Sequence, residues 1–347
     1  MSRSMNRRTM IRFTAAASGM AAAGVAFPIS AAAGRPGSAV AAVDGDNQSA
    51  TRMVGKVYQR HANRAGGTWN SLITIAMPGG GVETAVQVDP DTEVEAYSVN
   101  KIAVAVAVLD KVDRALLSID QRIEVTPDIL VPGGDGIFGL DAAYPSHITL
   151  GHVLAALLTI SDDSASRMCG LVCPAAEINQ IMVSKGFTKI QVKPVANPNR
   201  FFLGKTTPRE THDLLQALTR GALLSVSSTE RLLSLLRAPI AFTDGIRRTM
   251  SSSQRQRIAT KAGWFNDGRN EAGVMFDRNG GPALIYSMFA HGQTDPEDFG
   301  ATHPAVQARA RMGPAFLASV DSLNMSASTI PTWPCPAYAP SNGGGDS

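Results

Sequence analysis

Apolar positions recur at helical spacing over residues 50–66, and the spacing then changes to that of strands. Residues 68–90 read as two strands joined by a glycine-rich turn. From the alanine- and valine-rich run after Ser98 to about residue 236 the pattern is mainly helical, most clearly at 147–172 and 206–225. The first two thirds of the chain therefore predict a short pair of strands followed by a long helical segment.

The last third of the chain returns to strands. Three apolar runs at 257–267, 271–280 and 282–292 predict strands, and residues 302–323 predict a closing helix. Because strands stand at both ends with helices between them, we expect an α+β fold. It would have an antiparallel sheet flanked by terminal helices, with an inserted all-helical subdomain.

The same pattern predicts the limits of the subdomains. Residues 48–97 and 240–325 would together form an α/β subdomain, and residues 98–239 a helical subdomain. The glycine-rich tail at 326–347 is predicted to be disordered.

The N-terminal segment has the layout of an export signal. Paired Arg7 and Arg8 precede a weakly apolar stretch that ends in small residues, and cleavage after Ala33 or Ala41 would suit an Ala-x-Ala rule. We therefore expect a twin-arginine signal peptide and polar leader over 1–41. Glycine, serine and proline interrupt the apolar stretch, so no stable membrane anchor is expected. We therefore expect the twin-arginine export machinery as a partner, and we expect the protein to be secreted or located in the cell envelope.

Composition narrows the functional classes. Hydrophobic content of 44% with 18% charged residues is ordinary for a globular enzyme, and a net charge of +3 without a basic stripe gives no basis for nucleic-acid binding. Three cysteines cannot build a disulfide framework, and Cys169 and Cys173 fit core packing while Cys335 fits a free thiol. The six histidines lack metal-binding spacing. We expect a monomer without metal or cofactor.

Three short motifs carry the candidate chemistry. They are Ser98-Val-Asn-Lys101, Ser161-Asp162-Asp163 and Lys261-Ala262-Gly263. Taken singly, they read equally well as a helix cap with a surface lysine, a turn cluster, and a strand lysine before a bend. Together they stand in this order, each at the edge of a strong apolar segment.

This order resembles the class A β-lactamase and penicillin-binding serine hydrolase superfamily, whose signatures are Ser-x-x-Lys, Ser-Asp-Asn and Lys-Thr-Gly. The resemblance runs from about residue 50 to 325. Further matches are "GGDGIFGL" at 133–140, "TTPRE" at 206–210 and "GWFNDGRNEAGVMF" at 263–276. The resemblance implies the fold described above and acyl transfer from a small-molecule substrate through a covalent serine ester.

Each catalytic candidate has a physical reason for its residue type. Ser98 at a helix N-terminus lies in the positive end of the helix dipole, which favours developing alkoxide character. Lys101 lies one turn on, where apolar neighbours disfavour the ammonium and let the free amine take the serine proton. The resemblance implies that Ser161 passes a proton to the leaving group and that Lys261 adds positive potential.

The resemblance also implies a substrate-binding set. The backbone N–H groups of Ser98 and Trp264 would form the oxyanion hole. The remaining positions of the set are Asp163, Ala262 and Gly263.

Three departures from the family pattern put its usual substrate in question. No acid occurs between Gly186 and Thr207, where the family places the glutamate that activates the deacylating water, and the nearest acid, Glu210, falls in the following helix. Asp163 replaces an asparagine and places negative charge near the catalytic lysine. Ala262 replaces a threonine, which removes a hydroxyl that would hold a substrate carboxylate.

Several functions stay open at this point. The first is an exported serine hydrolase acting on a β-lactam or a related amide or ester. A D-alanyl-D-alanine peptidase or an acyltransferase uses the same residues. A β-lactam-binding protein that is acylated without turnover belongs to another class, as does a pseudoenzyme with a structural role.

Overall fold

The structure is a computed structural model that describes residues 37–78, 80–141, 143–323, 331–335 and 338–340 of the 347-residue chain. The predicted signal peptide lies outside the described residues as far as position 36. Its remaining five positions, 37–41, are helical.

A five-stranded antiparallel sheet joins the two ends of the chain, as predicted. Its strand order is β2-β1-β10-β9-β8, so the last three strands continue the first two. The strands are β1 (Thr68–Ala76), β2 (Val82–Val88), β8 (Ile258–Phe265), β9 (Gly268–Phe276) and β10 (Pro282–His291). Strand β8 is an edge strand, and this edge bears one of the predicted motifs.

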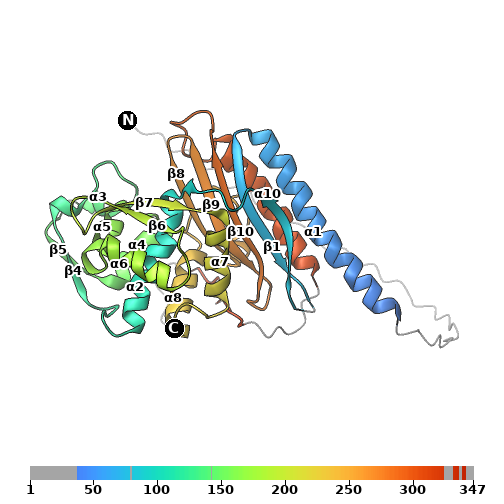
Figure 1. Cartoon of the computed structure of the whole chain (residues 1–347), viewed down its shortest axis with the longest axis horizontal. Helices are drawn as coiled ribbons and strands as arrows, with labels where there is room; N and C mark the ends of the chain where they lie inside the picture. The colour runs from blue at the N-terminus through green and yellow to red at the C-terminus, as the bar shows by residue number, and fades with distance from the viewer. Residues whose placement is uncertain (1–36, 79, 142, 324–330, 336–337, 341–347) are drawn as a thin grey trace, which may run out of the picture.

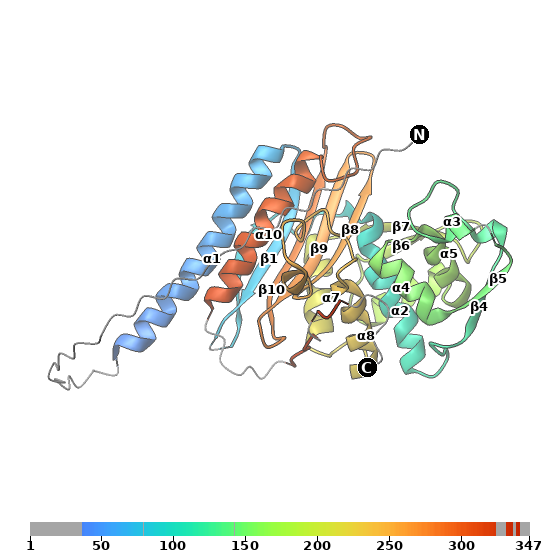
Figure 2. The same cartoon turned by 180° about the vertical axis from the view of Figure 1, so that it is seen from behind.

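Two helices cover one face of the sheet. Helices α1 (Gly37–Ala65) and α10 (Pro304–Ser322) lie side by side there (Figures 1 and 2). Val54 and Phe316, each 0% exposed, belong to the core between helices and sheet. Helix α1 begins well before residue 50, where apolar periodicity predicted its start, and a cleavage after Ala41 would fall inside it.

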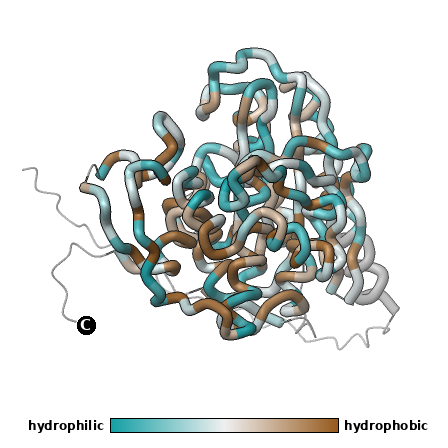
Figure 3. The backbone as a smooth tube through the Cα atoms, turned by 60° about the vertical axis from the view of Figure 1, so that its left-hand side comes forward, coloured by the Kyte–Doolittle hydropathy of each residue, from teal (hydrophilic) through white to brown (hydrophobic). Residues whose placement is uncertain are grey.

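Helices from the middle of the chain lie against the other face and beyond the β8 edge of the sheet (Figure 1). They are α2 (Lys101–Asp113), α4 (Leu150–Thr159), α5 (Asp163–Val172), α6 (Ala175–Ser184), α7 (Pro208–Thr219) and α8 (Val226–Arg237). Of these, α7 and α8 pack on the strands of the sheet. Every residue of α2 from Lys101 to Leu109 is buried, which explains its unbroken run of small apolar side chains. Hydrophobic stretches of backbone run through this packed region (Figure 3).

The inserted segment is not wholly helical. One small sheet pairs β4 (Arg122–Val125) with β5 (Ser146–Thr149), and another orders β3 (Val94–Glu95), β7 (Phe201–Thr206) and β6 (Gln191–Pro194). The short turns of helix are η1 (Tyr97–Asn100), η2 (Pro127–Ile129), α3 (Phe138–Asp141) and α9 (Ser252–Arg255). These strands are too short for the periodicity of the sequence to have distinguished them from loops.

The prediction of a disordered tail is wrong at Trp333. This side chain is 5% exposed, and its indole Nε1 donates to the Thr219 carbonyl at 2.8 Å. Its backbone carbonyl accepts from the Arg237 guanidinium at 2.5 Å, and its N–H donates to Gly280. Burial of a large aromatic surface stabilises order that tail composition does not reveal. No helix within the described ranges is long and apolar enough to cross a membrane.

Candidate active site

The predicted nucleophile lies where the 3₁₀ turn η1 meets strand β8. Ser98 follows Tyr97, whose φ of 48° is left-handed and unusual for a non-glycine residue. A Cβ on Gly263 would lie 2.7 Å from the Ser98 backbone nitrogen, so only glycine permits this approach of the strand. This contact brings Ser98 beside the strand segment that continues into Trp264. Ser98 and Trp264 are the two residues predicted to form the oxyanion hole.

Lys101 is buried one turn after Ser98, with a side-chain exposure of 0%. Its Nζ donates to the Ser161 carbonyl at 2.6 Å, to the Ser161 Oγ at 3.1 Å and to the Asp163 carboxylate at 2.7 Å. Burial lowers the pKa of Lys101, whereas the charge and hydrogen bond of Asp163 act to raise it. The prediction that desolvation acts against the ammonium holds, and so does the prediction that Asp163 opposes it.

Ser161 bridges two lysines. Its Oγ accepts from Lys101 and also from the Nζ of Lys261 at 2.9 Å. Burial, followed by the nearby charge of Lys101, holds the pKa of Lys261 well below its usual range. Ser161 itself has a φ of 59°, a backbone strain at the junction of α4 and α5 of the kind found at functional sites. Three of the four predicted catalytic residues thus share one hydrogen-bonded cluster.

The Ser98 hydroxyl is not part of that cluster. Within the part of the chain that the structure describes, the Ser98 Oγ makes no hydrogen bond, and Lys101 directs its three donors to Ser161 and Asp163. For Lys101 to accept a proton from Ser98, its amine must lose a proton and give up one of these contacts. Lys101 follows Ser98 by one turn, but its ammonium is paired with Ser161 and Asp163 instead.

Asp162 and Asp163 tie the cluster to the loop that carries "GGDGIFGL". Asp162 caps helix α5, and its Oδ2 accepts from the Ile137 N–H at 2.7 Å. Asp163 accepts from the Asp135 N–H at 3.2 Å, while its own N–H donates to the Asp135 carbonyl at 3.0 Å. Asp135 is a site residue that the sequence reasoning missed, although the "GGDGIFGL" match on which it lies was noticed.

The predicted substrate-binding positions on β8 differ in accessibility. Ala262 is 0% exposed, so its methyl group does not line the open site; its carbonyl accepts from Lys261 Nζ at 2.7 Å. Trp264 is half-buried and its ring lies 5.5 Å from that of Phe242. A threonine hydroxyl at Ala262 would therefore not reach a ligand without a change in the strand.

The carboxylate nearest to the family's glutamate position is occupied elsewhere. Glu210 lies in the first turn of α7, as predicted, and its oxygens accept the backbone N–H groups of Thr188, Lys189 and Ile190 at 2.7–3.1 Å. The acid-free segment before it folds into the β6–β7 hairpin, which Asn100 holds through bonds to the carbonyls of Leu203 and Lys205. Glu210 therefore supports this hairpin and does not point a base at Ser98.

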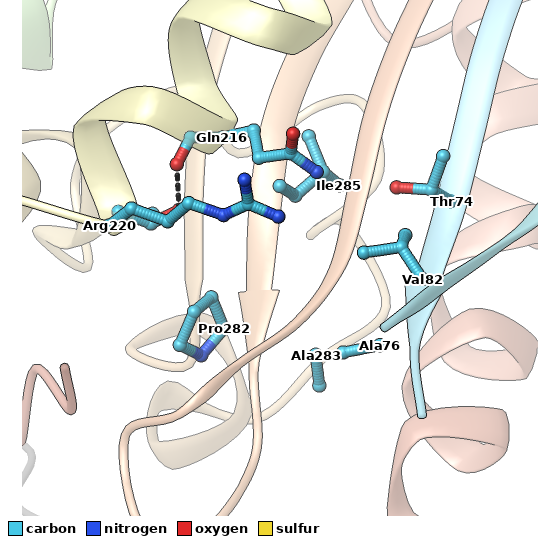
Figure 4. A pocket seen from close by; sticks show the side chains of 9 residues that line it. Thr74, Ala76, Val82, Gln216, Arg220, Pro282, Ala283 and Ile285 are labelled. Atoms are coloured by element: carbon cyan, nitrogen blue, oxygen red, sulfur yellow. Dashed lines mark hydrogen bonds between the residues drawn. The ribbon is translucent and has the colours of Figure 1, made fainter. Parts of the chain in front are cut away.

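One cavity elsewhere is too small to hold a substrate. It lies between α7 and strands β1, β2 and β10, where Gln216 and Arg220 face Thr74 and Val82 (Figure 4). Its volume of about 20 Å³ accommodates little more than one water molecule. In the described ranges no group of histidine, cysteine or acidic side chains is arranged to hold a metal ion.

An α+β fold with a serine beside a buried lysine, a second serine and a second lysine defines the class of serine acyl-transfer enzymes. A sequence profile described as the beta-lactamase enzyme family matches residues 55–318. The chain belongs to this family, and it is a serine hydrolase.

Three known proteins illustrate the likeness. The beta-lactamase regulatory protein BlaB of Streptomyces cacaoi is 29% identical over 107 residues, covering 30% of this chain and 34% of BlaB, so the chain matches only about a third of that relative. A beta-lactamase from Sphaerobacter thermophilus superposes with a TM-score of 0.63 at 21% identity, covering 77% of this chain and 95% of the other. PBP-A, solved as a mutant acyl-enzyme complex with penicillin G, has a TM-score of 0.58 at 21% identity, covering 78% and 97%.

Proposed function

We propose that this protein hydrolyses a β-lactam, or a related amide or ester, through an ester on Ser98. The observation that carries the proposal is the Ser161 hydroxyl, which accepts hydrogen bonds from Lys101, one turn after Ser98, and from Lys261, two residues before the Gly263 that contacts Ser98. A proton relay between the attacking oxygen and the leaving group needs a hydroxyl in this position.

In the acylation step the Ser98 Oγ attacks the carbonyl carbon and its proton passes to the free amine of Lys101. The backbone N–H groups of Ser98 and Trp264 stabilise the oxyanion. As the carbonyl–nitrogen or carbonyl–oxygen bond breaks, Lys101 returns the proton through Ser161 to the leaving group. Lys261, whose pKa is held well below its usual range by burial and by the charge of Lys101, donates a hydrogen bond to the Ser161 hydroxyl within this relay.

Intact-mass measurement tests the proposal. The protein is mixed with penicillin G and, separately, with an activated ester, and both product and covalent adduct are followed. Product formation by the native chain and its loss in Ser98→Ala are the expected results. Equal product formation by both proteins would remove Ser98 from the mechanism and overturn the proposal.

A long-lived acyl-enzyme is the second candidate, and one observation favours it. Glu210 is bound to three backbone N–H groups and the preceding hairpin contains no acid, so the usual water-activating carboxylate is missing. PBP-A forms a penicillin adduct, and the name of BlaB describes a regulator of a beta-lactamase; both facts suit a protein that senses or retains the acyl group. A stable adduct on Ser98 without product would select this candidate.

Transfer to another nucleophile and D-alanyl-D-alanine peptidase activity use the same intermediate. Adding an amine acceptor to the acylation reaction distinguishes transfer from hydrolysis, because transfer raises product formation and yields the amide. A D-alanyl-D-alanine peptide tested in parallel distinguishes peptidase activity by release of D-alanine.

We also propose export by the twin-arginine pathway, on the strength of the paired Arg7 and Arg8 and the small-residue stretch after them. The double variant Arg7→Lys with Arg8→Lys is expected to retain the protein in the cytoplasm. Unchanged appearance of the double variant outside the cell would contradict this route.

A further inference from the structure

The charges around the two lysines are unusual for a site that would bind an anion. Three carboxylates, Asp135, Asp162 and Asp163, act to raise the pKa of Lys101, and Asp135 and Asp163 act in the same way on Lys261. Asp163 pairs directly with Lys101 at 2.7 Å. The two lysine side chains, whose pKa values burial lowers, are therefore outnumbered by the nearby carboxylates, and Lys101 is already in a direct ion pair.

Asp135 is the carboxylate that a ligand would meet first. Its backbone is fixed by two hydrogen bonds to Asp163, at 3.0 and 3.2 Å, so the residue is held in place over the cluster. The side chain is exposed and accepts no hydrogen bond from any described residue. Since Asp163 bonds Lys101, the backbone bonds place Asp135 beside the lysine cluster, where its negative charge acts to raise the pKa of both lysines. Partial burial and the charge of Asp163 raise the pKa of the Asp135 carboxyl itself.

The nearest guanidinium on the strands does not restore a positive field. Arg269 stands opposite Trp264 in the β8–β9 register, but it is 1% exposed. Its nitrogens donate to the backbone carbonyls of Asn266, Gly268 and Asp298, among others. It cannot reach a substrate carboxylate without breaking these bonds.

Apolar side chains stand exposed on the two segments that flank the cluster. Ile137, two residues after Asp135, is 52% exposed, and Phe265, two residues after Gly263, is 58% exposed with its ring 6.0 Å from that of Tyr97. Such surfaces gain by contact with an apolar substituent of a ligand. They add no charge that could compensate an anionic one.

We propose that Asp135 and Asp163 make this site selective for an uncharged or cationic acyl donor, so that a donor with a carboxylate beside the scissile bond acylates Ser98 more slowly than its uncharged analogue. The inference rests on the proposed function, because it concerns the donor that acylates Ser98. Repulsion by the free Asp135 and neutralisation of Lys101 by Asp163 act in the same direction on an incoming anion. The two aspartates are specificity-determining residues in this account.

A matched pair of donors tests the inference. Penicillin G and its methyl ester carry the same β-lactam and differ in one negative charge. The second-order rate of Ser98 acylation is measured by intact mass for both donors with the native protein, Asp135→Asn and the control Asp141→Asn, which makes the same change in α3, six residues away. Comparing the ratio of the two rates within each variant removes any general effect on the nucleophile.

The native protein is expected to react faster with the ester, and Asp135→Asn to shift the ratio about three- to tenfold toward the acid, with Asp141→Asn unchanged. Raising the salt concentration should shift the native ratio in the same direction, which keeps the test available if a variant fails to fold. Faster reaction of the native protein with the acid, or a ratio insensitive to both Asp135→Asn and salt, overturns the inference and leaves the proposed function intact. Acylation by neither donor nor by an activated ester overturns both.

Discussion

Two buried groups of charged side chains lie on opposite sides of strand β8, and they differ in how completely the protein encloses them. On the face toward α10, Glu271 and Arg309 pair at 2.9 Å with exposures of 0% and 1%. The Glu271 carboxylate also accepts from Thr260 Oγ1 at 2.8 Å and from the Ile246 N–H at 3.2 Å. Every contact of that carboxylate is made inside the protein, so this face is closed.

The face toward the helices is built from similar chemistry but is only partly enclosed, because Ser98 is half-buried and the Asp163 side chain is 33% exposed. Lys261, the neighbour of Thr260, bonds Ser161, and Lys101 bonds Ser161 and the partly exposed Asp163. Ser98 lies beside this group with its hydroxyl unbonded to any described residue. Buried charge alone therefore does not indicate a functional site. A serine hydroxyl without a hydrogen bond, close in the chain to a lysine with a lowered pKa, is typical of one.

The largest expected effect is the loss of acylation when the base is removed. Lys101→Met keeps the volume of the side chain and should lower the rate of Ser98 acylation by about 10²–10⁴-fold, because no other amine is positioned one turn from Ser98. Lys111→Met, on the same helix but bonded to Glu177, is the control and should react normally. Stopped-flow or intact-mass kinetics with an activated ester measure both. Retention of the native rate in Lys101→Met would contradict the assignment of the base.

A substitution on the closed face should lower the free energy of unfolding. Arg309→Met leaves the Glu271 carboxylate buried without its cation, and we expect a loss of about 3–5 kcal/mol in the free energy of unfolding. Urea denaturation measures it. The double variant Glu271→Leu with Arg309→Met should be more stable than the single one, because no unpaired charge remains. Equal instability of the two variants would count against this interpretation.

Two glycines offer a matched test of the two faces. A Cβ at Gly263 would lie 2.7 Å from the Ser98 nitrogen, whereas a Cβ at Gly245 would lie 2.0 Å from Glu271 Oε2. Gly263→Ala should therefore lower acylation about tenfold to a hundredfold through misplacement of Ser98. Gly245→Ala should instead cost about 1–3 kcal/mol of stability. Acylation rates and urea midpoints are measured for both variants. Lower acylation in Gly245→Ala together with lower stability in Gly263→Ala would contradict these assignments of the two faces.

The smallest effect is a displacement of a pH profile. Burial lowers the pKa of Lys101 and Asp163 raises it, so Asp163→Asn should lower that pKa further. A base acts only when unprotonated, so the acylation rate rises as pH passes upward through its pKa. The rising limb of the profile should accordingly move to lower pH in Asp163→Asn. Acylation rates over a pH series measure the limb; a limb that stays in place, or moves upward, would remove Asp163 from control of Lys101.

Much of the fold followed from local pattern. The strands at both ends of the chain, the helical insertion and the buried α2 all have periodicities that neighbours within a few residues create. The β6–β7 hairpin and the start of α1 escaped prediction because short strands and polar helical turns have weak periodicity. Trp333 escaped it because its partners, Thr219 and Gly280, are distant in sequence.

The site was predicted in part. Residue types and spacing made Ser98, Lys101, Ser161 and Lys261 the catalytic candidates, because a Ser-x-x-Lys pair one helical turn apart has a chemical meaning that needs no fold. Asp135 was not identified, since an acid in a glycine-rich loop is uninformative until the loop is placed beside Lys101. Ala262 was assigned to the substrate, yet alternation along β8 turns its side chain away from the site where Lys261 points.

The amino-acid pattern was enough to predict the secondary structure at both ends of the chain, the family and the candidate catalytic groups. Only the tertiary structure decided that Lys101 bonds Ser161 and Asp163, sixty residues away in the chain, and that Glu210 is bound to backbone groups. Helical and strand periodicity arise from neighbours along the chain, whereas the proton affinity of a lysine is set by burial and by charges that only packing brings within a few ångströms.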